Sequence, residues 1–331
     1  MSIGGDLVLS VRNLDVKFYT YAGVVHAVSN VSFDVYKGEI VALVGETGCG
    51  KSVTTKAITR LIDPPGRIEG GKAYFRRRNG EVVDLLSLSD EEIRDIRGNE
   101  IAYVFQDPTS ALDPIYTIGH HFYETMIDHR KIDKKNAIQH AVNLLKETLI
   151  PSPESRVKNY PHELSGGMRQ RSVIAIGLSN NPVLLIADEP TTNLDVTIQA
   201  QILELIKDLQ AKHGMSVILI THNLGVVAEV AHRVYVMYAG KIVEEAPVEE
   251  LFENPQHPYT RLLLRTVPDP TKKIEKLESI PGTVPSLINP LPGCRFRDRC
   301  PFASEKCLEE PPMVEVGEAH RVYCWLHAGK G

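Results

Sequence analysis

The sequence lacks the features of a membrane-spanning, secreted or nucleic-acid-binding protein. No stretch of its 331 residues approaches the roughly 20 consecutive apolar residues that a membrane-spanning helix requires. Residues 1–6 lack the basic start and the apolar core of a secretory signal peptide. The formal net charge is -5, whereas general nucleic-acid binding usually needs a basic surface. We therefore expect a cytosolic chain that binds no nucleic acid and reaches a membrane only through another subunit.

Cysteine is scarce and unevenly distributed. Cys49 lies alone near the N-terminus, whereas the other four crowd the C-terminal end of the chain: Cys294, Cys300, Cys307 and Cys324. In a reducing compartment, such a cluster indicates metal ligation more than disulfide bonds. The same region is rich in proline and has few periodic apolar segments. It therefore needs a cross-link, such as a bound metal, to be stable, and the four cysteines are the candidates.

The rest of the sequence alternates between strand-like and helix-like patterns. Short alternating or wholly apolar runs predict strands at residues 7–14, 24–35, 40–44, 101–105, 183–187, 217–220 and 234–237. Helical patterns predict helices at residues 52–62, 165–178, 196–212 and 224–231, and a longer helical region at 115–149. Strands separated by such helices imply parallel crossovers, and hence an α/β fold with a mostly parallel sheet core.

Segments that do not alternate between strand and helix patterns mark subdomains and a C-terminal extension. The strands before residue 45 predict an N-terminal antiparallel β subdomain, and the region from about 107 to 180 a helical subdomain inserted into the core. Ser89 and Glu92 have the spacing of a capping box and predict a short helix. A proline-rich segment begins after residue 255, so we expect one large domain at 1–255. Residues 256–331 are expected to form a small, loop-rich C-terminal extension with one helix at about 259–265.

Residues 45–52 form a phosphate-binding motif. They match G-x-x-x-x-G-K-[ST] at every fixed position, with an apolar strand before them and a helix after. The glycines let successive N–H groups bind phosphate oxygens, Lys51 brings a charge to the β- and γ-phosphates, and Ser52 can bind Mg²⁺. A glycine-rich turn with an incidental lysine, the alternative, does not explain this context. The predicted ATP-binding residues here are Gly45, Glu46, Thr47, Gly48, Cys49, Gly50, Lys51, Ser52 and Thr54.

Two carboxylates, Asp188 and Glu189, follow the predicted strand at 183–187. They therefore lie at the carboxyl edge of the sheet, where α/β proteins bind ligands. Asp188 is predicted to hold Mg²⁺ through water, and Glu189 to orient or deprotonate the attacking water. A strand that simply ends in solvated acids is the alternative for an isolated pair, but the phosphate-binding motif favours hydrolysis of ATP.

The segment Leu164 to Arg171, LSGGMRQR, resembles the signature of the ABC ATPases. Its order relative to the phosphate-binding motif and the Asp-Glu pair matches that family. The serine and glycines would open a helix whose free N–H groups can meet a γ-phosphate. In the family this phosphate belongs to the facing protomer. The resemblance therefore implies contacts with the partner's ATP from Ser165, Gly166, Gly167 and Gln170.

Two further polar residues fit the pattern of this P-loop NTPase family. Gln106 resembles the glutamine that links the nucleotide to the transporter, and the resemblance implies a Mg²⁺ site with Ser52 and Asp188. His222 resembles the switch histidine that contacts the γ-phosphate. With Glu189, these residues are the predicted catalytic set.

The family pattern extends to the dimer seam and the adenine. Asp195 resembles the aspartate of the D-loop at the seam, although Asn193 replaces the small residue usual there. For the aromatic residue that stacks on adenine, Tyr21 is our choice and Tyr19 the alternative. The resemblance covers residues 7 to about 250.

A narrower resemblance is to the dipeptide and oligopeptide importer ATPases, at residues 160–163, 188–192 and 254–260. Met168 and the paired threonines 191 and 192 resemble the D-type subunit, which pairs with an F-type ATPase subunit as a heterodimer. The resemblance implies a subunit that powers peptide uptake from the cytoplasmic face of the inner membrane. Its other partners would be two membrane permease subunits and an extracytoplasmic peptide-binding protein. Nickel or oligosaccharide cargo, or a non-transport ABC ATPase, are the alternatives.

The four clustered cysteines follow the spacing C-x5-C-x6-C-x16-C, without the C-x2-C pairs of common zinc modules. Three arginines between the first two cysteines are interpreted as offsetting the negative charge of a cluster: Arg295, Arg297 and Arg299. Importer ATPases with a similar tail carry a [4Fe–4S] cluster. The resemblance therefore implies this cluster on Cys294, Cys300, Cys307 and Cys324, with a structural role expected. Zinc, or reduced or disulfide-bonded cysteines, are the alternatives.

Overall fold

The computed structural model describes residues 4–192, 194–266 and 280–329. Its strands are β1 (Leu7–Thr20), β2 (Gly23–Tyr36), β3 (Ile40–Val44), β4 (Gly66–Arg76), β5 (Val82–Asp84), β6 (Ile101–Val104), β7 (Leu184–Asp188), β8 (Ser216–Ile220), β9 (Arg233–Tyr238), β10 (Lys241–Pro247), β11 (Met313–Gly317) and β12 (His320–Tyr323). Its α-helices are α1 (Lys51–Ile58), α2 (Asp90–Ile96), α3 (Ile118–Ile127), α4 (Lys134–Glu147), α5 (Pro153–Arg156), α6 (Gly166–Gly177), α7 (Val196–His213), α8 (Leu224–Val230), α9 (Val248–Glu253) and α10 (Pro258–Arg265).

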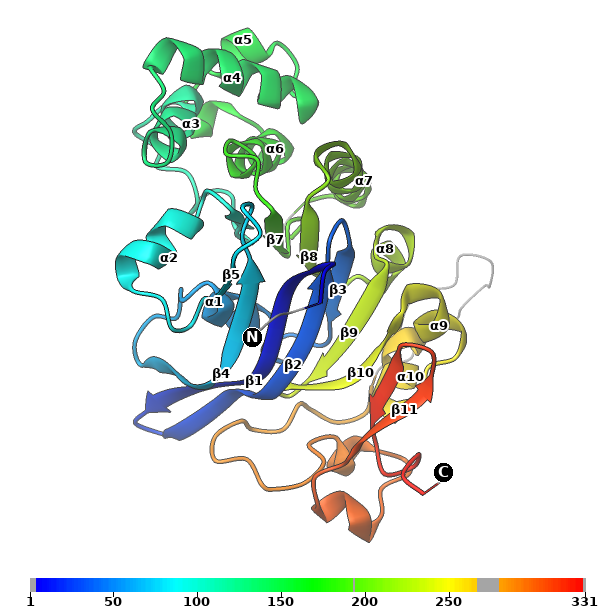
Figure 1. Cartoon of the computed structure of the whole chain (residues 1–331). Helices are drawn as coiled ribbons and strands as arrows, with labels where there is room; N and C mark the ends of the chain where they lie inside the picture. Colours follow the sequence, from blue (N-terminus) through cyan, green and yellow to red (C-terminus); the bar gives the residue numbers. More distant parts are fainter. Residues whose placement is uncertain (1–3, 193, 267–279, 330–331) are drawn as a thin grey trace.

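An eight-stranded sheet forms the core, in the order β11-β12-β10-β9-β3-β8-β7-β6 (Figure 1). The five strands from β9 to β6 are parallel, which confirms the predicted parallel core. Every residue of β3, β7 and β8 is buried, because helices or the second sheet cover both faces of these strands. The parallel strands therefore bring the loops after β3, β6, β7 and β8 to one edge of the sheet.

β1 and β2 form a separate antiparallel sheet with β4 and β5, in the order β2-β1-β4-β5, which confirms the predicted N-terminal antiparallel subdomain. The strands β4 and β5 were not predicted. The predicted capping box at Ser89 is also confirmed. Its hydroxyl accepts a hydrogen bond from the Glu92 N–H at 3.2 Å, while the Glu92 carboxylate accepts one from the Ser89 N–H at 2.7 Å. These bonds satisfy two of the free N–H groups at the start of α2.

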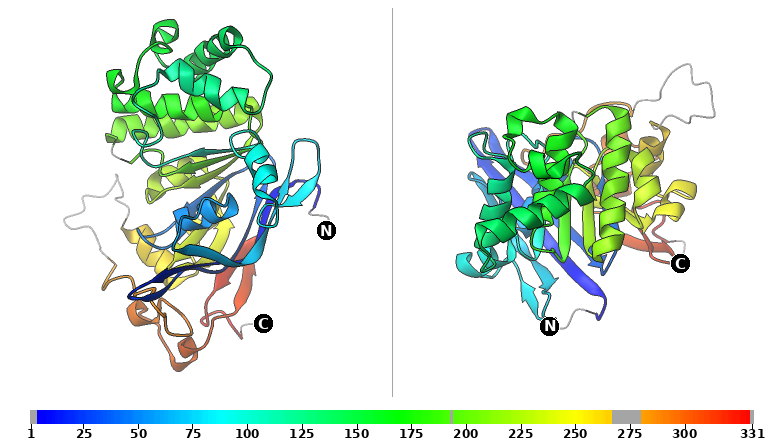
Figure 2. Two further views of the ribbon diagram at one scale, coloured as in Figure 1. Left: turned by 90° about the vertical axis from the view of Figure 1, so that its left-hand side faces the viewer. Right: turned by 90° about the horizontal axis from the view of Figure 1, so that it is seen from above.

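Helices α3, α4 and α5 lie at one end of the molecule, and the C-terminal extension lies at the other (Figures 1 and 2). Phe122, Met126 and Leu144 are buried in the cluster that joins this helical part to α6 and the sheet. The predicted inserted helical region is thus packed onto the core by apolar side chains. In the described part of the chain, no helix has the length and apolar character needed to cross a membrane.

The C-terminal extension continues the core sheet, which the sequence analysis did not predict. β12 pairs with β10 through Glu244 opposite Val322 and Glu245 opposite Arg321, and β11 completes a hairpin with β12. The expectation of an extension made of loops and one helix was therefore incomplete. Backbone pairing to the core sheet holds this part of the extension in place.

A buried carboxylate reinforces this junction. Glu244 is fully buried and accepts hydrogen bonds from His320 Nε2 at 2.8 Å, from the Gln256 N–H at 2.6 Å and from the His257 N–H at 2.9 Å. Burial raises the pKa of Glu244, but these bonds, led by that from His320, lower it below its usual value. The ionised carboxylate thus joins β10, β12 and the start of α10.

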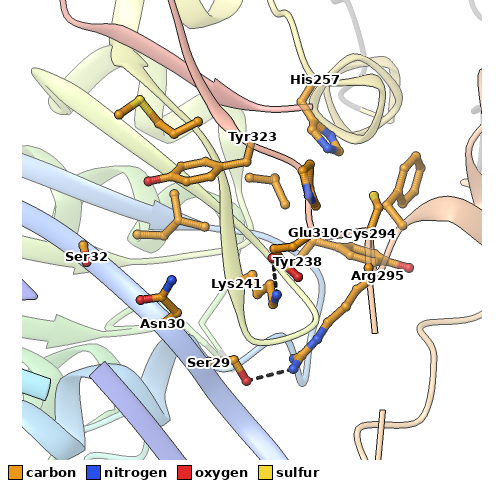
Figure 3. A pocket seen from close by; sticks show the side chains of 16 residues that line it. Ser29, Asn30, Ser32, Tyr238, Lys241, His257, Cys294, Arg295, Glu310 and Tyr323 are labelled. Atoms are coloured by element: carbon orange, nitrogen blue, oxygen red, sulfur yellow. Dashed lines mark hydrogen bonds and ion pairs between the residues drawn. The ribbon is translucent and has the colours of Figure 1, made fainter. Parts of the chain in front are cut away.

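Arg295 attaches the extension at a second place, beside a cavity of about 240 Å³ (Figure 3). Its guanidinium donates to the hydroxyl of Ser29 on β2 at 2.8 Å and to the carbonyl oxygen of Ala239 in the β9–β10 turn. Residues 287–289 also run beside β2, where the His26 N–H donates to the Leu287 carbonyl at 2.8 Å. The extension therefore contacts both sheets.

Candidate functional site

The predicted phosphate-binding loop connects β3 to α1, and two of its glycines are required by the local geometry. Gly45 has φ of 149°, and a Cβ there would come within 2.1 Å of the Met237 carbonyl oxygen. Gly50 has φ of 102°, and a Cβ there would come within 2.5 Å of the Ala27 carbonyl oxygen. Because a side chain would clash with backbone at both positions, only glycine fits this curve. The ammonium group of Lys51 donates to the carbonyl oxygen of Gly45 at 2.9 Å, inside the curve.

Two other predicted ATP-binding residues, Thr54 on α1 and Cys49 in the loop, have buried side chains. The Thr54 hydroxyl donates to the Gly50 carbonyl at 2.9 Å, which stabilises the start of α1. Cys49 is buried against the loop, and burial raises the pKa of its thiol. This agrees with the interpretation of Cys49 as a bystander and not a nucleophile. Thr47 and Gly48 are exposed at the tip of the loop.

Asp188 joins the two halves of the site. One of its oxygens, Oδ1, accepts a hydrogen bond from the Ser52 hydroxyl at 2.7 Å, and Oδ2 accepts one from the Tyr103 hydroxyl at 2.9 Å. Burial raises the pKa of Asp188, and the two hydrogen bonds oppose this effect without cancelling it. Tyr103 was not among the predicted site residues, because a tyrosine in an apolar strand carries no sign of a polar partner. The Ser52 and Asp188 side chains thus meet where Mg²⁺ binding was predicted.

The other two predicted catalytic residues, Gln106 and His222, both approach the carboxylate of Glu189. Its Oε2 accepts a hydrogen bond from Gln106 Nε2 at 3.1 Å and from the Thr192 hydroxyl at 2.9 Å, and lies 3.7 Å from His222 Nδ1. Glu189 has φ of 44°, a conformation that few non-glycine residues adopt, and its N–H donates to the Ile220 carbonyl at 3.0 Å. The backbone after β7 therefore turns so that the carboxylate points toward the loops after β6 and β8.

The predicted signature lies at the start of α6. Ser165 caps this helix, and its hydroxyl accepts a hydrogen bond from the Met168 N–H at 3.3 Å. Gly166 and Gly167 follow it in the first turn, partly exposed. Gln170 is only 1% exposed, and its burial favours packing within the helical part over direct contact with a partner's nucleotide.

The aspartate of the predicted D-loop caps the next helix. The Asp195 carboxylate accepts a hydrogen bond from the Ile198 N–H at 3.0 Å, at the start of α7. Leu194, its neighbour, approaches Gly166 of the signature. Asn193 lies outside the described residues.

The two candidate adenine-stacking tyrosines differ in their surroundings. Tyr21 is fully exposed at the β1–β2 turn. The Tyr19 hydroxyl donates to Glu69 at 3.0 Å, and the Arg67 guanidinium lies 5.1 Å from the centre of its ring. Tyr19 therefore already has partners, whereas the ring of Tyr21 is open to solvent.

The four clustered cysteines line one cavity of about 100 Å³, together with His257, Phe296 and Trp325. Burial, followed by the neighbouring cysteines, raises the pKa of Cys294 to about 11. Within residues 4–192, 194–266 and 280–329, no three His, Cys, Asp or Glu side chains form a group that could hold a metal ion. The predicted iron–sulfur and zinc sites are therefore not confirmed.

The three nearby arginines are engaged by partners other than the cysteines. Arg295 binds Ser29 and Ala239, and Arg297 donates to the Pro292 carbonyl oxygen at 2.6 Å. Arg299 donates to Glu46 in the phosphate-binding loop at 2.7 Å. These guanidinium groups thus hydrogen-bond to other parts of the chain, and their predicted effect on the charge at the cysteines stays a prediction.

The fold and the site together define an ATP-hydrolysing P-loop cassette, and comparison with known proteins narrows this class. Residues 28–192 match the family described as ABC transporter, and residues 243–307 match the C-terminal region of oligopeptide and dipeptide transporters. The dipeptide transport ATP-binding protein DppD of Bacillus subtilis is 51% identical over 97% of this chain and 95% of its own length. A probable peptide ABC transporter ATP-binding protein of Sinorhizobium fredii is 49% identical over the same shares.

A solved structure agrees with this assignment. A dimeric ATP-binding cassette in a post-hydrolysis state, bound to ADP and phosphate, is 26% identical with a TM-score of 0.64. The similarity covers 72% of this chain and 98% of that cassette. The chain therefore belongs to the ABC transporter family, among its ATP-binding proteins of the peptide-transport type.

Proposed function

We propose that this chain forms composite ATP sites with a second ATPase subunit of the F type. Each site takes the phosphate-binding loop, the Asp-Glu pair and the switch histidine from one subunit, and the signature from the other. ATP with Mg²⁺ then holds the two surfaces together, and hydrolysis releases them. Hydrolysis would thus drive a cycle of closing and opening.

Within this chain's site, Lys51 and the loop N–H groups bind the phosphates. Ser52, Asp188 and Gln106 hold Mg²⁺, and the Glu189 carboxylate orients and deprotonates the attacking water. His222 contacts the γ-phosphate. The observation that carries this assignment is the convergence of Gln106 and His222 on Glu189 Oε2 at 3.1 Å and 3.7 Å.

The substitution Glu189→Gln tests the assignment. An amide keeps the hydrogen bonds that orient Gln106 but cannot take a proton, so ATP binding should persist while turnover falls at least a hundredfold. The measurement is phosphate release by the heterodimer, with ATP affinity measured in parallel. Glu204→Gln is the matched control, because Glu204 is an exposed glutamate on α7. Undiminished hydrolysis by the Glu189 variant would show that Glu189 is not the general base.

We propose that the complex imports di- or oligopeptides. The relatives at about 50% identity are named for dipeptide and oligopeptide transport, including OppD of Bacillus subtilis. Two permease subunits would receive the motion from the helical part and the Gln106 loop, and a peptide-binding protein would deliver the cargo. The chain would then act at the cytoplasmic face of the inner membrane as a peripheral subunit. Peptide-stimulated ATP hydrolysis by the reconstituted complex is the test, and stimulation by nickel or oligosaccharides alone would contradict it.

We also propose that the four clustered cysteines hold a [4Fe–4S] cluster. Such a cluster takes one thiolate at each iron, so its ligands surround a volume and need not meet at one ion. Four cysteines that line a single cavity support this proposal. When bound, the cluster would cross-link the extension; the thiols themselves come from the segment after Gly293, the 3-10 helix Glu305–Leu308 and the end of β12.

Chemical analysis of anaerobically purified protein tests this cluster. The full chain should be brown and contain about four iron and four acid-labile sulfide per chain. Cys300→Ser should lose most of the iron, whereas Cys49→Ser, which changes the one cysteine outside the cavity, should keep it. Colourless protein with one zinc per chain would contradict the proposal.

A further inference from the structure

The C-terminal extension makes a direct ion pair with the phosphate-binding loop. Arg299 donates from Nη1 to Glu46 Oε2 at 2.7 Å and from Nη2 to Glu46 Oε1 at 3.1 Å, so both carboxylate oxygens are engaged. Bidentate pairs of this kind are among the strongest hydrogen-bonded contacts between side chains. The Arg299 side chain is 5% exposed and that of Glu46 27%, so the pair is shielded from solvent on the arginine side.

Every N–H donor of Arg299 has an acceptor. Besides Glu46, the guanidinium donates to the Pro281 carbonyl at 2.8 Å, the Tyr238 hydroxyl at 3.3 Å and the Ile280 carbonyl at 3.3 Å. Burial alone would lower the pKa of Arg299, but the hydrogen bonds to Glu46 and Tyr238 raise it overall. The charge is therefore permanent and its position is fixed by the extension.

A second contact reaches the same loop residue. The hydroxyl of Tyr259, on α10, accepts a hydrogen bond from the Glu46 N–H at 2.9 Å. Tyr259 is fully buried and packs on Tyr238, with ring centres 4.6 Å apart. On the other side of Glu46, its carbonyl oxygen accepts a bond from Lys51 Nζ at 3.2 Å. Glu46 is thus held through its side chain, its N–H and its carbonyl.

Glu46 creates an electrostatic difficulty for a loop that binds phosphates. It is the only acidic residue between 45 and 52, and its negative charge lies in the loop that the proposed function assigns to ATP. An unpaired carboxylate there would repel the phosphate groups. Arg299 cancels this charge, and it comes from the extension, not from the ATPase core.

We propose that Arg299 and Tyr259 are positioning residues through which the C-terminal extension makes the phosphate-binding loop competent to bind ATP. Arg299 neutralises Glu46 and fixes its side chain, while Tyr259 fixes its backbone. This inference rests on the proposed ATP site, because it concerns the affinity of that site. It gives the extension a part in nucleotide binding in addition to its structural role.

The experiment measures the affinity of the full-length chain for MgATP by titration calorimetry. Arg299→Ala should weaken binding about tenfold, because it leaves Glu46 charged and unpaired beside the phosphates. Tyr259→Phe should weaken binding about threefold, because it removes one hydrogen bond. Arg297→Ala is the matched control, since Arg297 lies two residues away in the same 3-10 helix, Arg297–Arg299, and donates to the Pro292 carbonyl.

A double variant separates positioning from a general loss of structure. In Glu46→Gln/Arg299→Ala the repelling charge is gone, so affinity should return to within about threefold of that of the unsubstituted chain. Damage to the extension alone would not be rescued by a change in the loop. Unchanged affinity in Arg299→Ala, or weak binding that Glu46→Gln does not rescue, would overturn the inference.

Lys51→Ala distinguishes this failure from failure of the proposed function. Loss of binding in Lys51→Ala with full binding in Arg299→Ala would leave the ATP site intact and reject only the inference. Full binding in Lys51→Ala would instead reject the proposed ATP site itself, and the inference with it.

Discussion

Acidification should loosen α10, the helix that brings Tyr259 to the phosphate-binding loop. His257 caps this helix, and its Nδ1 accepts a hydrogen bond from the Tyr259 N–H at 3.0 Å. The ring is 1% exposed. Burial lowers the pKa of His257 to about 4, although the nearby carboxylate of Glu244 acts in the opposite direction. The folded state therefore needs His257 in its neutral form.

The size of the effect follows from the difference in proton affinity between the two states. In an opened or unfolded chain, the pKa of His257 returns to about 6.5. Between pH 6.5 and pH 4 the opened state binds a proton that the folded state does not, so stability falls as the pH falls. Each pKa unit corresponds to about 1.36 kcal/mol. The free energy of opening α10 should thus decrease by about 2 kcal/mol from pH 7 to pH 5, and by about 3 kcal/mol near pH 4.

Amide hydrogen exchange in α10, measured at pH 7 and pH 5 and corrected for intrinsic exchange rates, tests this prediction. His257→Asn keeps a helix-capping acceptor but does not titrate, so it should lose most of the pH dependence. His162→Asn, at an exposed histidine, should keep it. Equal opening free energies at both pH values in the parent chain, or the same decrease in His257→Asn, would refute the reasoning.

Three further experiments test the ATP sites. Tyr103→Phe removes the hydroxyl that donates to Asp188, so kcat for ATP hydrolysis should fall about tenfold with little change in KM; an unchanged kcat would exclude a role in turnover. Tyr21→Ala should raise KM for ATP about tenfold and Tyr19→Ala less than twofold, because the ring of Tyr21 is free to stack; the reverse result would assign stacking to Tyr19. Ser165→Arg should impair hydrolysis at the partner's site more than at this chain's own, measured in heterodimers with one site inactivated; equal loss at both sites would contradict the exchange of signatures.

Much of the site was predictable because its functional residues lie in short segments with fixed spacing. The loop at 45–52 needs glycine where backbone approaches backbone, and these positions are fixed within eight residues. Ser89 and Glu92 satisfy each other across three residues, so their capping box was visible in the sequence. The loops that carry Gln106, Glu189 and His222 follow parallel strands, and this topology brings their side chains together.

Contacts between distant segments were not predictable in the same way. β12 owes its strand form to pairing with β10, where Val322 lies opposite Glu244, far earlier in the chain, and β11 in turn pairs with β12. The partner of Arg299 is 253 residues away, so its place between two cysteines suggested a nearby anionic cluster instead. Tyr103 binds Asp188 across the sheet, from a strand whose residues read simply as buried. In each case the missing information was which surfaces meet.

The pairing of β12 with β10 also bears on how this chain can be divided. Removal of residues 313–323 would leave β10 paired only with β9 and expose the N–H and C=O groups on the edge that β12 now covers. Bare strand edges recruit strands from other molecules, so a shortened chain would be prone to aggregate. Boundaries for recombinant fragments should therefore keep the hairpin, even when only the cassette is of interest.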